Sequence, residues 1–323
     1  MKLGVLSAAL ADMTMEEMFQ YFNKIGVDAV ELGAGGFPGK AHVNPAELLK
    51  NPGDIDKIGE LAKKYNIHIA ALACHGNPVH PTKEIAEAYH RDMEEAILVA
   101  ERLGIKRIVG FSGCPGTDPD GKMPSWVVCA WPDDYPKVLE YQWNDVLIPY
   151  WEKMGKYAMD HGIEQIAFEM HPGFCVYNPE TCLRLRDAVG PILGANLDPS
   201  HLFWQGIDIL AAIRTLGDAG ALYHFHAKDT KIDAINCAQN GVLDTKNLAD
   251  ERHRSWIFRT IGYGHDMQIW RDIISNLRMV GYDDVISIEH EDALMSPTEG
   301  LEKAVAFMKQ CLIYEDRGVA FWA

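Results

Sequence analysis

The sequence of 323 residues carries 46 acidic and 30 basic residues, which gives a formal charge of −16 at pH 7. With 48% hydrophobic residues, it has the composition of a globular protein with an ample core, in one large α/β domain or two smaller ones. A surface that binds DNA or RNA needs positive charge, and no cluster of basic residues interrupts the acidic sequence, so no nucleic-acid partner is expected.

The cysteine pattern and the apolar runs bear on where the protein works. The seven cysteines form no Cys-x-x-Cys pair, which favours reduced thiols in the cytoplasm over disulfides or a cysteine zinc site. The opening MKLGVLSAALA has the lysine and apolar run of a short signal peptide, but an acidic amphipathic segment at 12–21 follows directly, which favours a first strand. No apolar run reaches the roughly 18–20 residues of a membrane-spanning helix, so no membrane association is expected.

Short β-rich runs alternate with segments of helical apolar spacing along the whole chain. The runs predict eight strands, at residues 3–7, 29–32, 67–73, 107–111, 165–169, 194–197, 222–226 and 285–289. The segments between them predict helices at 15–25, 45–50, 54–65, 84–103, 145–159, 179–189, 207–215, 270–280 and 298–311. Glycine follows several of these helices, as at Gly26 and Gly104, where it accepts the left-handed conformation of a helix C-terminus.

Eight strand–helix units predict one α/β domain over residues 1–323, a (β/α)8 TIM barrel, which typically takes ~250 residues plus insertions. A doubly wound sheet is the alternative, but no GxGxxG motif follows the first strand. The extra length lies mainly at 113–143 and 231–268, after the fourth and seventh strands. Because barrel active sites form at the C-terminal ends of strands, these insertions are predicted to be lids or substrate walls. For 113–143, an interface with a second chain is the alternative.

Polar residues end the last four predicted strands. The fifth, in IAFEMHP at 166–172, is apolar yet places Glu169 and His171 on one side, because side chains alternate along a strand. Asp198, His226 and Glu289 lie at the ends of the sixth, seventh and eighth strands. Three converging carboxylates would repel one another, so a divalent metal is predicted among them. Two glutamates, an aspartate and a histidine suit Mn²⁺ best, with Mg²⁺, Co²⁺ and Zn²⁺ as further choices.

With these strand ends, the chain resembles the xylose isomerase-like barrels over nearly its whole length. Within them it is similar to the sugar (phosphate) isomerases and epimerases that include the tagatose and psicose 3-epimerases. The resemblance implies four metal ligands, Glu169, Asp198, His226 and Glu289. It implies further that Glu169 and Glu289 act as bases, and that His201 of Asp198-Pro-Ser-His201 contacts the sugar. One motif departs from the epimerases: a substrate-binding arginine follows their seventh-strand histidine, whereas this chain reads His-Ala-Lys-Asp, with Lys228.

His171 lies outside that quartet of ligands. Together with FPGKAHVNP at 37–45 and RTIGYGHD at 259–266, it makes the chain resemble the large subunit of bacterial C-glycoside deglycosidases. This resemblance implies a carbon–carbon lyase with a small partner subunit in a hetero-oligomer, acting on 3-oxo-glucosides of flavonoids. His171 would remove the C2 proton beside the metal-bound C3 ketone, and β-elimination would release the aglycone from C1.

Further residues near the predicted mouth have two interpretations each. The aromatic residues of 113–143 are either a surface for a flat aglycone or packing against the barrel or a partner: Trp126, Trp131, Tyr135, Tyr141 and Trp143. Substrate contacts, with structural roles as the alternative, are expected of Glu31, His75, Lys228 and His265. His224, deeper in the seventh strand, is expected to be a packed, hydrogen-bonded core histidine.

Three other functions fit the pattern. A ketose isomerase or 3-epimerase would act on a sugar or a sugar phosphate with the same metal site. An abasic-site endonuclease gathers three zinc ions on this fold, but the charge of −16 argues against a DNA substrate. A non-catalytic sugar-binding subunit is the third, and it predicts that Glu169→Gln and Glu289→Gln leave the activity of the assembly intact.

Overall fold

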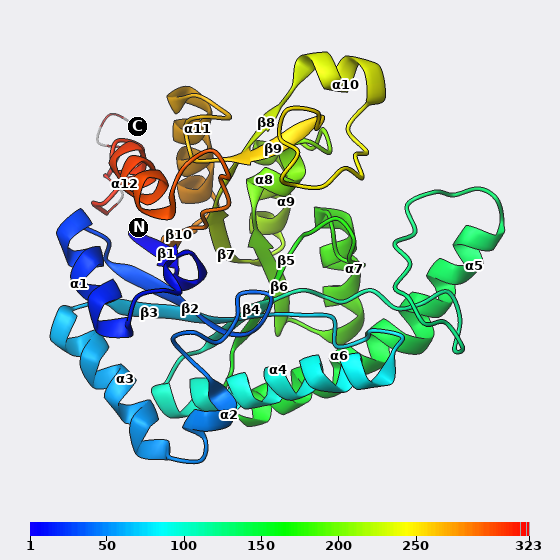
Figure 1. The fold of residues 1–323 in the computed structure, drawn as a ribbon, viewed down its shortest axis with the longest axis horizontal. Coiled ribbons are helices and arrows are strands. Elements are labelled where there is room, and N and C mark those ends of the chain that lie inside the picture. Colours follow the sequence, from blue (N-terminus) through cyan, green and yellow to red (C-terminus); the bar gives the residue numbers. More distant parts are fainter. Residues whose placement is uncertain (317, 321, 323) are drawn as a thin grey trace.

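Eight parallel strands close into a barrel in the computed structural model, which describes residues 1–316, 318–320 and 322. Their order around the barrel is β1-β10-β7-β6-β5-β4-β3-β2. The bounds are β1 (Lys2–Leu6), β2 (Ala29–Gly36), β3 (His68–His75), β4 (Arg107–Gly110), β5 (Gln165–Glu169), β6 (Leu193–Leu197), β7 (Leu222–Ala227) and β10 (Val285–Ile288). The predicted TIM barrel is confirmed (Figure 1).

Helices surround the strands and bury the core between the two layers (Figure 1). The long ones are α1 (Met15–Ile25), α3 (Pro52–Tyr65), α4 (Lys83–Leu103), α6 (Ile148–Asp160), α7 (Pro179–Val189), α9 (Ile209–Asp218), α11 (Met267–Met279) and α12 (Pro297–Met308). Short helical turns follow β1, β2 and β6, at Ser7–Leu10, α2 (Pro45–Leu48) and α8 (Pro199–Phe203). Fully buried large side chains such as Phe22, Trp151 and Trp270 each contribute about 1.5–3 kcal/mol of burial.

The ends of α1 show how local sequence sets the helix boundaries. Thr14 accepts a hydrogen bond from the Glu17 amide while the Glu17 carboxylate accepts from the Thr14 amide, a capping box. The helix ends at Gly26, which has a φ of 73° and donates to the Phe22 carbonyl. Gly104 ends α4 in the same left-handed conformation, with a φ of 70°. The expectation for these two glycines is confirmed.

The insertion after β4 is shorter than predicted, because its helical part begins earlier. α5 (Asp134–Tyr141), a π-helical stretch (Gln142–Leu147) and α6 run on without a break, whereas the sequence predicts a helix from 145. Tyr135, Val138 and Leu139 have helical spacing, but no residue of α5 is buried, so this short segment lacks the packed apolar face of the longer helices. Buried Gln142 donates to the carbonyls of Pro115, Gly116 and Ser125, and this fastens the loop before α5 to the helix.

The insertion after β7 forms a lobe with secondary structure of its own. β8 (Asp229–Ile232) pairs antiparallel with β9 (Trp256–Arg259), and α10 (Ala234–Asn240) lies between them in the chain. In Figure 1 this lobe and the arm that carries α5 both project from the barrel. Buried Asp229 holds the lobe's return loop, since it accepts from the amides of Gly262, Gly264 and His265.

Among the described residues, no helix is both long enough and apolar enough to cross a bilayer.

Candidate metal centre

Four side chains meet where β5, β6, β7 and β10 end. Each offers one ligand atom, and these atoms all lie within 4.8 Å of one another: Glu169, Asp198, His226 and Glu289. Three of the four residues are almost wholly buried, and the Glu289 side chain is 15% exposed. Asp198 is also the N-cap of α8: its Oδ1 accepts from the Ser200 amide at 2.8 Å, while its buried Oδ2 has no hydrogen bond. The predicted quartet thus converges in the fold.

The ring of His226 is oriented by a carboxylate behind it. Its Nε2 lies 2.9 Å from Glu31 Oε2, and since a carboxylate accepts, Nε2 carries a proton. Nδ1 faces Glu289 Oε2 at 3.1 Å and Glu169 Oε2 at 3.4 Å. Without a metal Nδ1 is protonated as well, because burial would lower the pKa of His226 but Glu31 and Glu289 raise it well above its usual value. A metal would displace this proton and bind Nδ1, while Glu31 keeps the other proton on Nε2.

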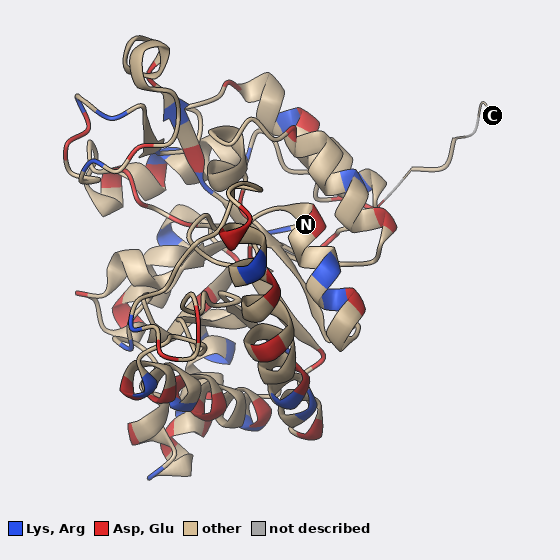
Figure 2. Cartoon of the chain, turned by 90° about the vertical axis from the view of Figure 1, so that its right-hand side faces the viewer, with Lys and Arg blue, Asp and Glu red and all other residues tan. Residues whose placement is uncertain are grey.

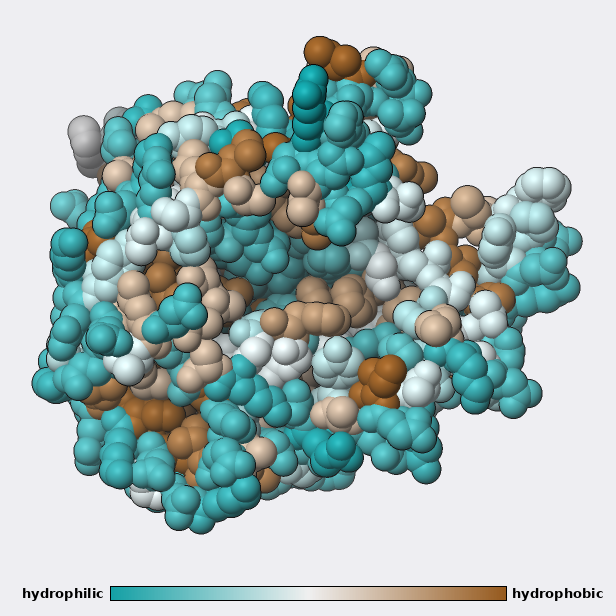
Figure 3. Space-filling view, in the orientation of Figure 1, coloured by the Kyte–Doolittle hydropathy of each residue, from teal (hydrophilic) through white to brown (hydrophobic). Residues whose placement is uncertain are grey.

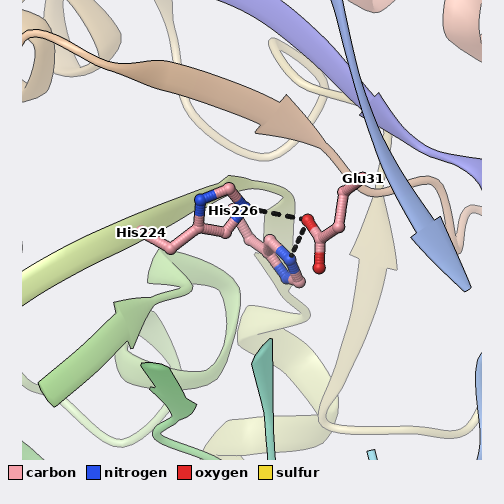
Figure 4. A group of neighbouring side chains, drawn as sticks. All are labelled: Glu31, His224 and His226. Atoms are coloured by element: carbon pink, nitrogen blue, oxygen red, sulfur yellow. Dashed lines mark hydrogen bonds and ion pairs between the residues drawn. The ribbon is translucent and has the colours of Figure 1, made fainter. Parts of the chain in front are cut away.

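Glu31 collects two further donors in the interior of the barrel. His224 Nε2 lies 2.8 Å from the same Oε2 (Figure 4), and Ser287 Oγ lies 2.9 Å from it. Burial alone would raise the pKa of Glu31, but the two histidines hold it well below its ordinary value. Glu31 is fully buried and does not line the cavity. The expected substrate contact is therefore corrected to an orienting contact with His226.

His224 connects this cluster to the opposite end of the barrel. Its Nδ1 accepts from Arg107 Nη1 at 3.3 Å, and Arg107 Nη2 binds Asp284 at 2.7 Å. Burial lowers the pKa of His224, so the ring is neutral and donates from Nε2 while accepting at Nδ1. It is fully buried, in line with the expected core histidine.

Lys228 supplies the positive charge nearest the carboxylates. Its Nζ lies 2.8 Å from Glu289, 2.9 Å from Glu291 and 3.1 Å from Asp198, and its side chain is 2% exposed. Burial raises the pKa of Glu289, but the charge of Lys228 together with the charge and hydrogen bond of His226 brings the value down to about 2. Burial raises the pKa of Asp198, and neighbouring carboxylates add to the shift. A divalent cation would relieve this crowding, so the residues fit a metal of the hard or borderline class.

Two histidines hold Glu169 in place. His201 Nε2 lies 2.8 Å from its Oε1, and His75 Nε2 lies 3.0 Å from its Oε2. Burial raises the pKa of Glu169, yet hydrogen bonds from His201, His226 and His75 lower it well below the ordinary value. His75 lines the cavity, as expected of a substrate contact, whereas His201 is buried outside the lining.

His171 stands beside the quartet with one nitrogen available. Its Nδ1 lies 2.6 Å from the Pro172 carbonyl, and because a carbonyl only accepts, Nδ1 carries the proton and Nε2 the lone pair. Its ring lies 4.1 Å from the ring of His201 and 5.0 Å from Phe111. Burial, with the His201 charge second, lowers the pKa of His171 to about 3, which leaves the imidazole neutral at neutral pH.

A cavity of about 230 Å³ opens above these groups. Its lining combines polar and apolar side chains, namely Leu6, Ala8, Ala9, Phe37, Pro38, His75, Phe111, Glu169, His171, Lys228, Glu289, His290 and Glu291. In Figure 3 the face of the molecule is hollowed near its centre, and hydrophilic residues line much of the hollow. His265 is absent from the lining: it stacks on Phe203 at 3.7 Å and contacts Asp229 at 2.7 Å. The expected substrate contact of His265 is corrected to anchoring of the β9–α11 loop.

The family model described as "Xylose isomerase-like TIM barrel" matches residues 19–311. The chain belongs to this family. Within the family, it is 39% identical over 315 residues to the uncharacterized protein YfiH of Bacillus subtilis strain 168, covering 97% of this chain and 99% of YfiH. Because YfiH is itself described as uncharacterized, this similarity says nothing about an activity.

Two solved structures show the same fold as this xylose isomerase-like barrel. The IOLI protein with a bound zinc atom gives a TM-score of 0.65 at 18% identity, over 97% of this chain and 98% of that one. The 3-keto-D-glucoside 4-epimerase YcjR from E. coli gives 0.65 at 14% identity, over 96% and 100%. Sugar epimerases thus occur among the structural neighbours of the chain, and a divalent metal occurs in one of them.

The aromatic residues of the arm do not reach the cavity of this barrel. Trp143 is buried under the Arg184 guanidinium at 3.9 Å, and Trp126 packs edge-on against Tyr177 at 5.4 Å. Trp131 is 78% exposed. Of the two interpretations of these side chains, packing of the arm accounts for Trp126 and Trp143.

No sequence pattern marks the aromatic side chains beside His171 as part of the site. Phe111, at the end of β4, stacks on Phe174 at 4.2 Å and lines the cavity. A phenylalanine that ends an apolar strand looks like core, so no pattern distinguishes it. Glu291 also lines the cavity, and alternation along the strand would put it on the same face as Glu289, two residues earlier.

Replacing Glu31 by glutamine is expected to weaken metal binding about 10–100-fold. The uncharged amide is a weaker hydrogen-bond acceptor than the carboxylate, so it no longer holds the proton of His226 on Nε2. Competition with a chromophoric chelator measures the dissociation constant. Ser287→Ala removes only one of the three donors to Oε2 and is expected to have a smaller effect. Equal affinities for the Glu31→Gln variant and the unaltered protein would show that Glu31 does not orient His226.

Proposed function

We propose that this barrel is a divalent-metal-dependent sugar isomerase or epimerase that removes and returns a proton next to a carbonyl. The observation that carries the proposal is the quartet of ligand atoms within 4.8 Å of one another, of which Glu169 and Glu289 line the same cavity as His171. Mn²⁺ is the first choice for three carboxylates and one imidazole, and Mg²⁺, Co²⁺ or Zn²⁺ would suit the same groups.

A divalent cation held by Glu169, Asp198, His226 and Glu289 would polarise the sugar carbonyl and stabilise the negative charge that develops as the neighbouring carbon loses its proton. Side chains that line the cavity would position the sugar. His75 lines the cavity beside Glu169 and offers a contact for a sugar hydroxyl. Phe111 presents an apolar face on the same side of the cavity as His171.

His171 is the proposed base. Its Nε2 lone pair makes no hydrogen bond within the described residues, and its proton on Nδ1 is fixed by the Pro172 carbonyl. Glu169 and Glu289 are needed as metal ligands, so each is the weaker candidate. In an epimerisation the proton would leave carbon for His171 Nε2, and a protonated Glu289, which also lines the cavity, would deliver another proton to the opposite face of the same carbon. His171 would then release its proton to solvent.

A second candidate is C-deglycosylation of a 3-oxo-glycoside. The first step would be the same proton loss, at C2, to give an enolate. Its electron pair would then form the C1=C2 double bond as the C3 ketone returns, while the bond from C1 to the aglycone breaks and the aglycone carbon takes up a proton with the departing electron pair. A 3-keto-D-glucoside is the substrate in the name of the E. coli neighbour, which favours this chemistry. The arm would then meet a small partner subunit in a hetero-oligomer. This candidate ranks second because the arm's aromatic residues lie outside the cavity lining.

The proposal also covers the cellular compartment and the absence of a nucleic-acid substrate. We place the protein in the cytoplasm, where the free cysteines would stay reduced. On the side drawn in Figure 2, basic and acidic residues are interspersed, and no broad basic surface for DNA is visible. An abasic-site endonuclease is therefore not proposed.

Deuterium exchange tests the shared step directly. The protein loaded with Mn²⁺ is incubated in D₂O with a panel of ketohexoses and with a 3-oxo flavonoid C-glucoside, and NMR follows label at carbon and new epimers. Deuterium at the carbon next to the carbonyl, with a new epimer, is the expected result. Release of aglycone would favour the second candidate, and absence of both label and product with full metal content would contradict the proposal.

A further inference from the structure

The cavity lining has a distinctive balance of charge. Lys228 is its only lysine or arginine, against three carboxylates from Glu169, Glu289 and Glu291. Two of those carboxylates belong to the proposed metal ligands, and Glu291 does not. Its side chain is 47% exposed, so it lies at the mouth of the cavity rather than among the ligands.

The Lys228 ammonium already contacts three carboxylates and lies over an aromatic ring. Nζ contacts Glu289 at 2.8 Å, Asp198 at 3.1 Å and Glu291 at 2.9 Å, and the Phe258 ring lies 4.7 Å away. If a metal engages Glu289 and Asp198, Glu291 remains as the partner of Lys228. A phosphate or carboxylate on a sugar would have to displace Glu291 from the only lysine or arginine in the lining, or lie beside it.

The backbone next to Glu291 holds it in this place. The adjacent Asp292 is buried, and its Oδ2 accepts from the Thr260 amide at 2.8 Å and from Arg259 Nε at 3.0 Å. Its Oδ1 accepts from the Leu294 amide at 2.9 Å. This turn is thereby tied to the lobe after β7, which keeps the Glu291 backbone at the mouth of the cavity, within reach of Lys228.

We infer that Glu291 makes this cavity selective for uncharged monosaccharides and excludes phosphorylated or carboxylated sugars. The inference rests on the proposed function and names the substrate class of the same site. A like charge placed next to an anionic group opposes binding, and selectivity against a competitor often comes from such a repulsive element. The cavity of about 230 Å³ agrees with one sugar unit, since pockets for drug-sized ligands typically take ~300–1,000 Å³.

Calorimetric titration of the Mn²⁺-loaded protein tests the inference through binding rather than turnover. The ligands are D-fructose, D-tagatose and D-psicose, each compared with its 6-phosphate, and inorganic phosphate alone. We expect the unaltered protein to bind the neutral sugars at least about 10²-fold more tightly than the phosphates. Glu291→Gln is expected to reduce this ratio at least about tenfold and to tighten inorganic phosphate, and Glu291→Asp to restore selectivity.

The control is Glu84→Gln, which makes the same change of charge on an exposed position of α4 outside the cavity lining. It is expected to keep the ratio of the unaltered protein. Equal binding of phosphorylated and neutral sugars, or an unchanged preference and unchanged phosphate binding in Glu291→Gln, would overturn the inference. If no neutral sugar binds and no deuterium exchanges, the proposed function fails, while the comparison with inorganic phosphate still decides the role of Glu291.

Discussion

Replacing Glu169 by glutamine is expected to lower kcat/KM for the deuterium-exchange reaction by roughly 10³-fold or more, together with loss of tightly bound metal. The substitution removes one of three carboxylate charges from the quartet. It also places an amide between His201 and His75, both of which now contact Glu169 oxygens. Elemental analysis of the purified variant and the exchange assay measure the two effects separately.

Glu164→Gln is the matched control, because Glu164 precedes β5 and its side chain is 69% exposed. It is expected to keep both metal content and activity. A Glu169→Gln variant with full activity would contradict the metal site, and would favour a non-catalytic sugar-binding role for the chain.

Replacing His171 by glutamine is expected to lower kcat by roughly 10²–10⁴-fold while leaving the metal content unchanged. This combination separates a base from a ligand, since loss of a ligand changes both quantities. The pH dependence gives a second test. Because burial lowers the pKa of His171 to about 3, the ring stays neutral as pH falls through 6.5, and protonation of His171 should reduce kcat/KM only near pH 3.

His253→Gln is the control for this variant, since His253 is exposed and pairs only with Asp250 within the described part of the chain. Exchange at the unaltered rate in His171→Gln would show that another group takes the proton. Glu169 and Glu289 would then be the remaining candidates. Loss of metal along with activity would instead assign His171 to the ligands.

The metal quartet was predictable from the sequence because strand geometry is regular. Side chains alternate along each strand, and parallel strands of a barrel end on the same side, so an acid or histidine at four successive ends converges. The eight predicted strands agree with the barrel for the same reason. These inferences need only the strand positions, which apolar runs mark well.

Depth along a strand was harder to predict, and Glu31 shows why. The sequence predicts that the second strand ends at 32, which places Glu31 at the mouth. In the structure β2 continues to Gly36 and β3 to His75, where the run Gly33-Ala34-Gly35-Gly36 pairs with its neighbour. Glycine-rich segments have low strand propensity, so only the neighbouring strand reveals the extension. Glu31 therefore lies in the interior, level with Ala71.

Contacts that join distant loops were outside the reach of the sequence. His265 was expected to face substrate, yet Asp229, 36 residues earlier, holds it against the lobe. The role of the Glu291 charge depends on its ion pair with Lys228, which lies 63 residues earlier in the sequence. Periodicity describes one element at a time and carries no information on such pairs.

The adjacent residues Lys228 and Asp229 have two separate roles. Lys228 faces the carboxylates, while Asp229 fastens the lobe that begins directly after it. The base of the lobe packs on the barrel as well, since Thr230 Oγ1 donates to the Ser200 carbonyl at 2.7 Å and Trp256 stacks on Trp204 at 4.7 Å. Its outer helix α10 buries none of its residues, so evolution or a protein engineer can lengthen, shorten or exchange that part without moving Lys228. A single residue added between Ala227 and Lys228 would turn the lysine away from the site.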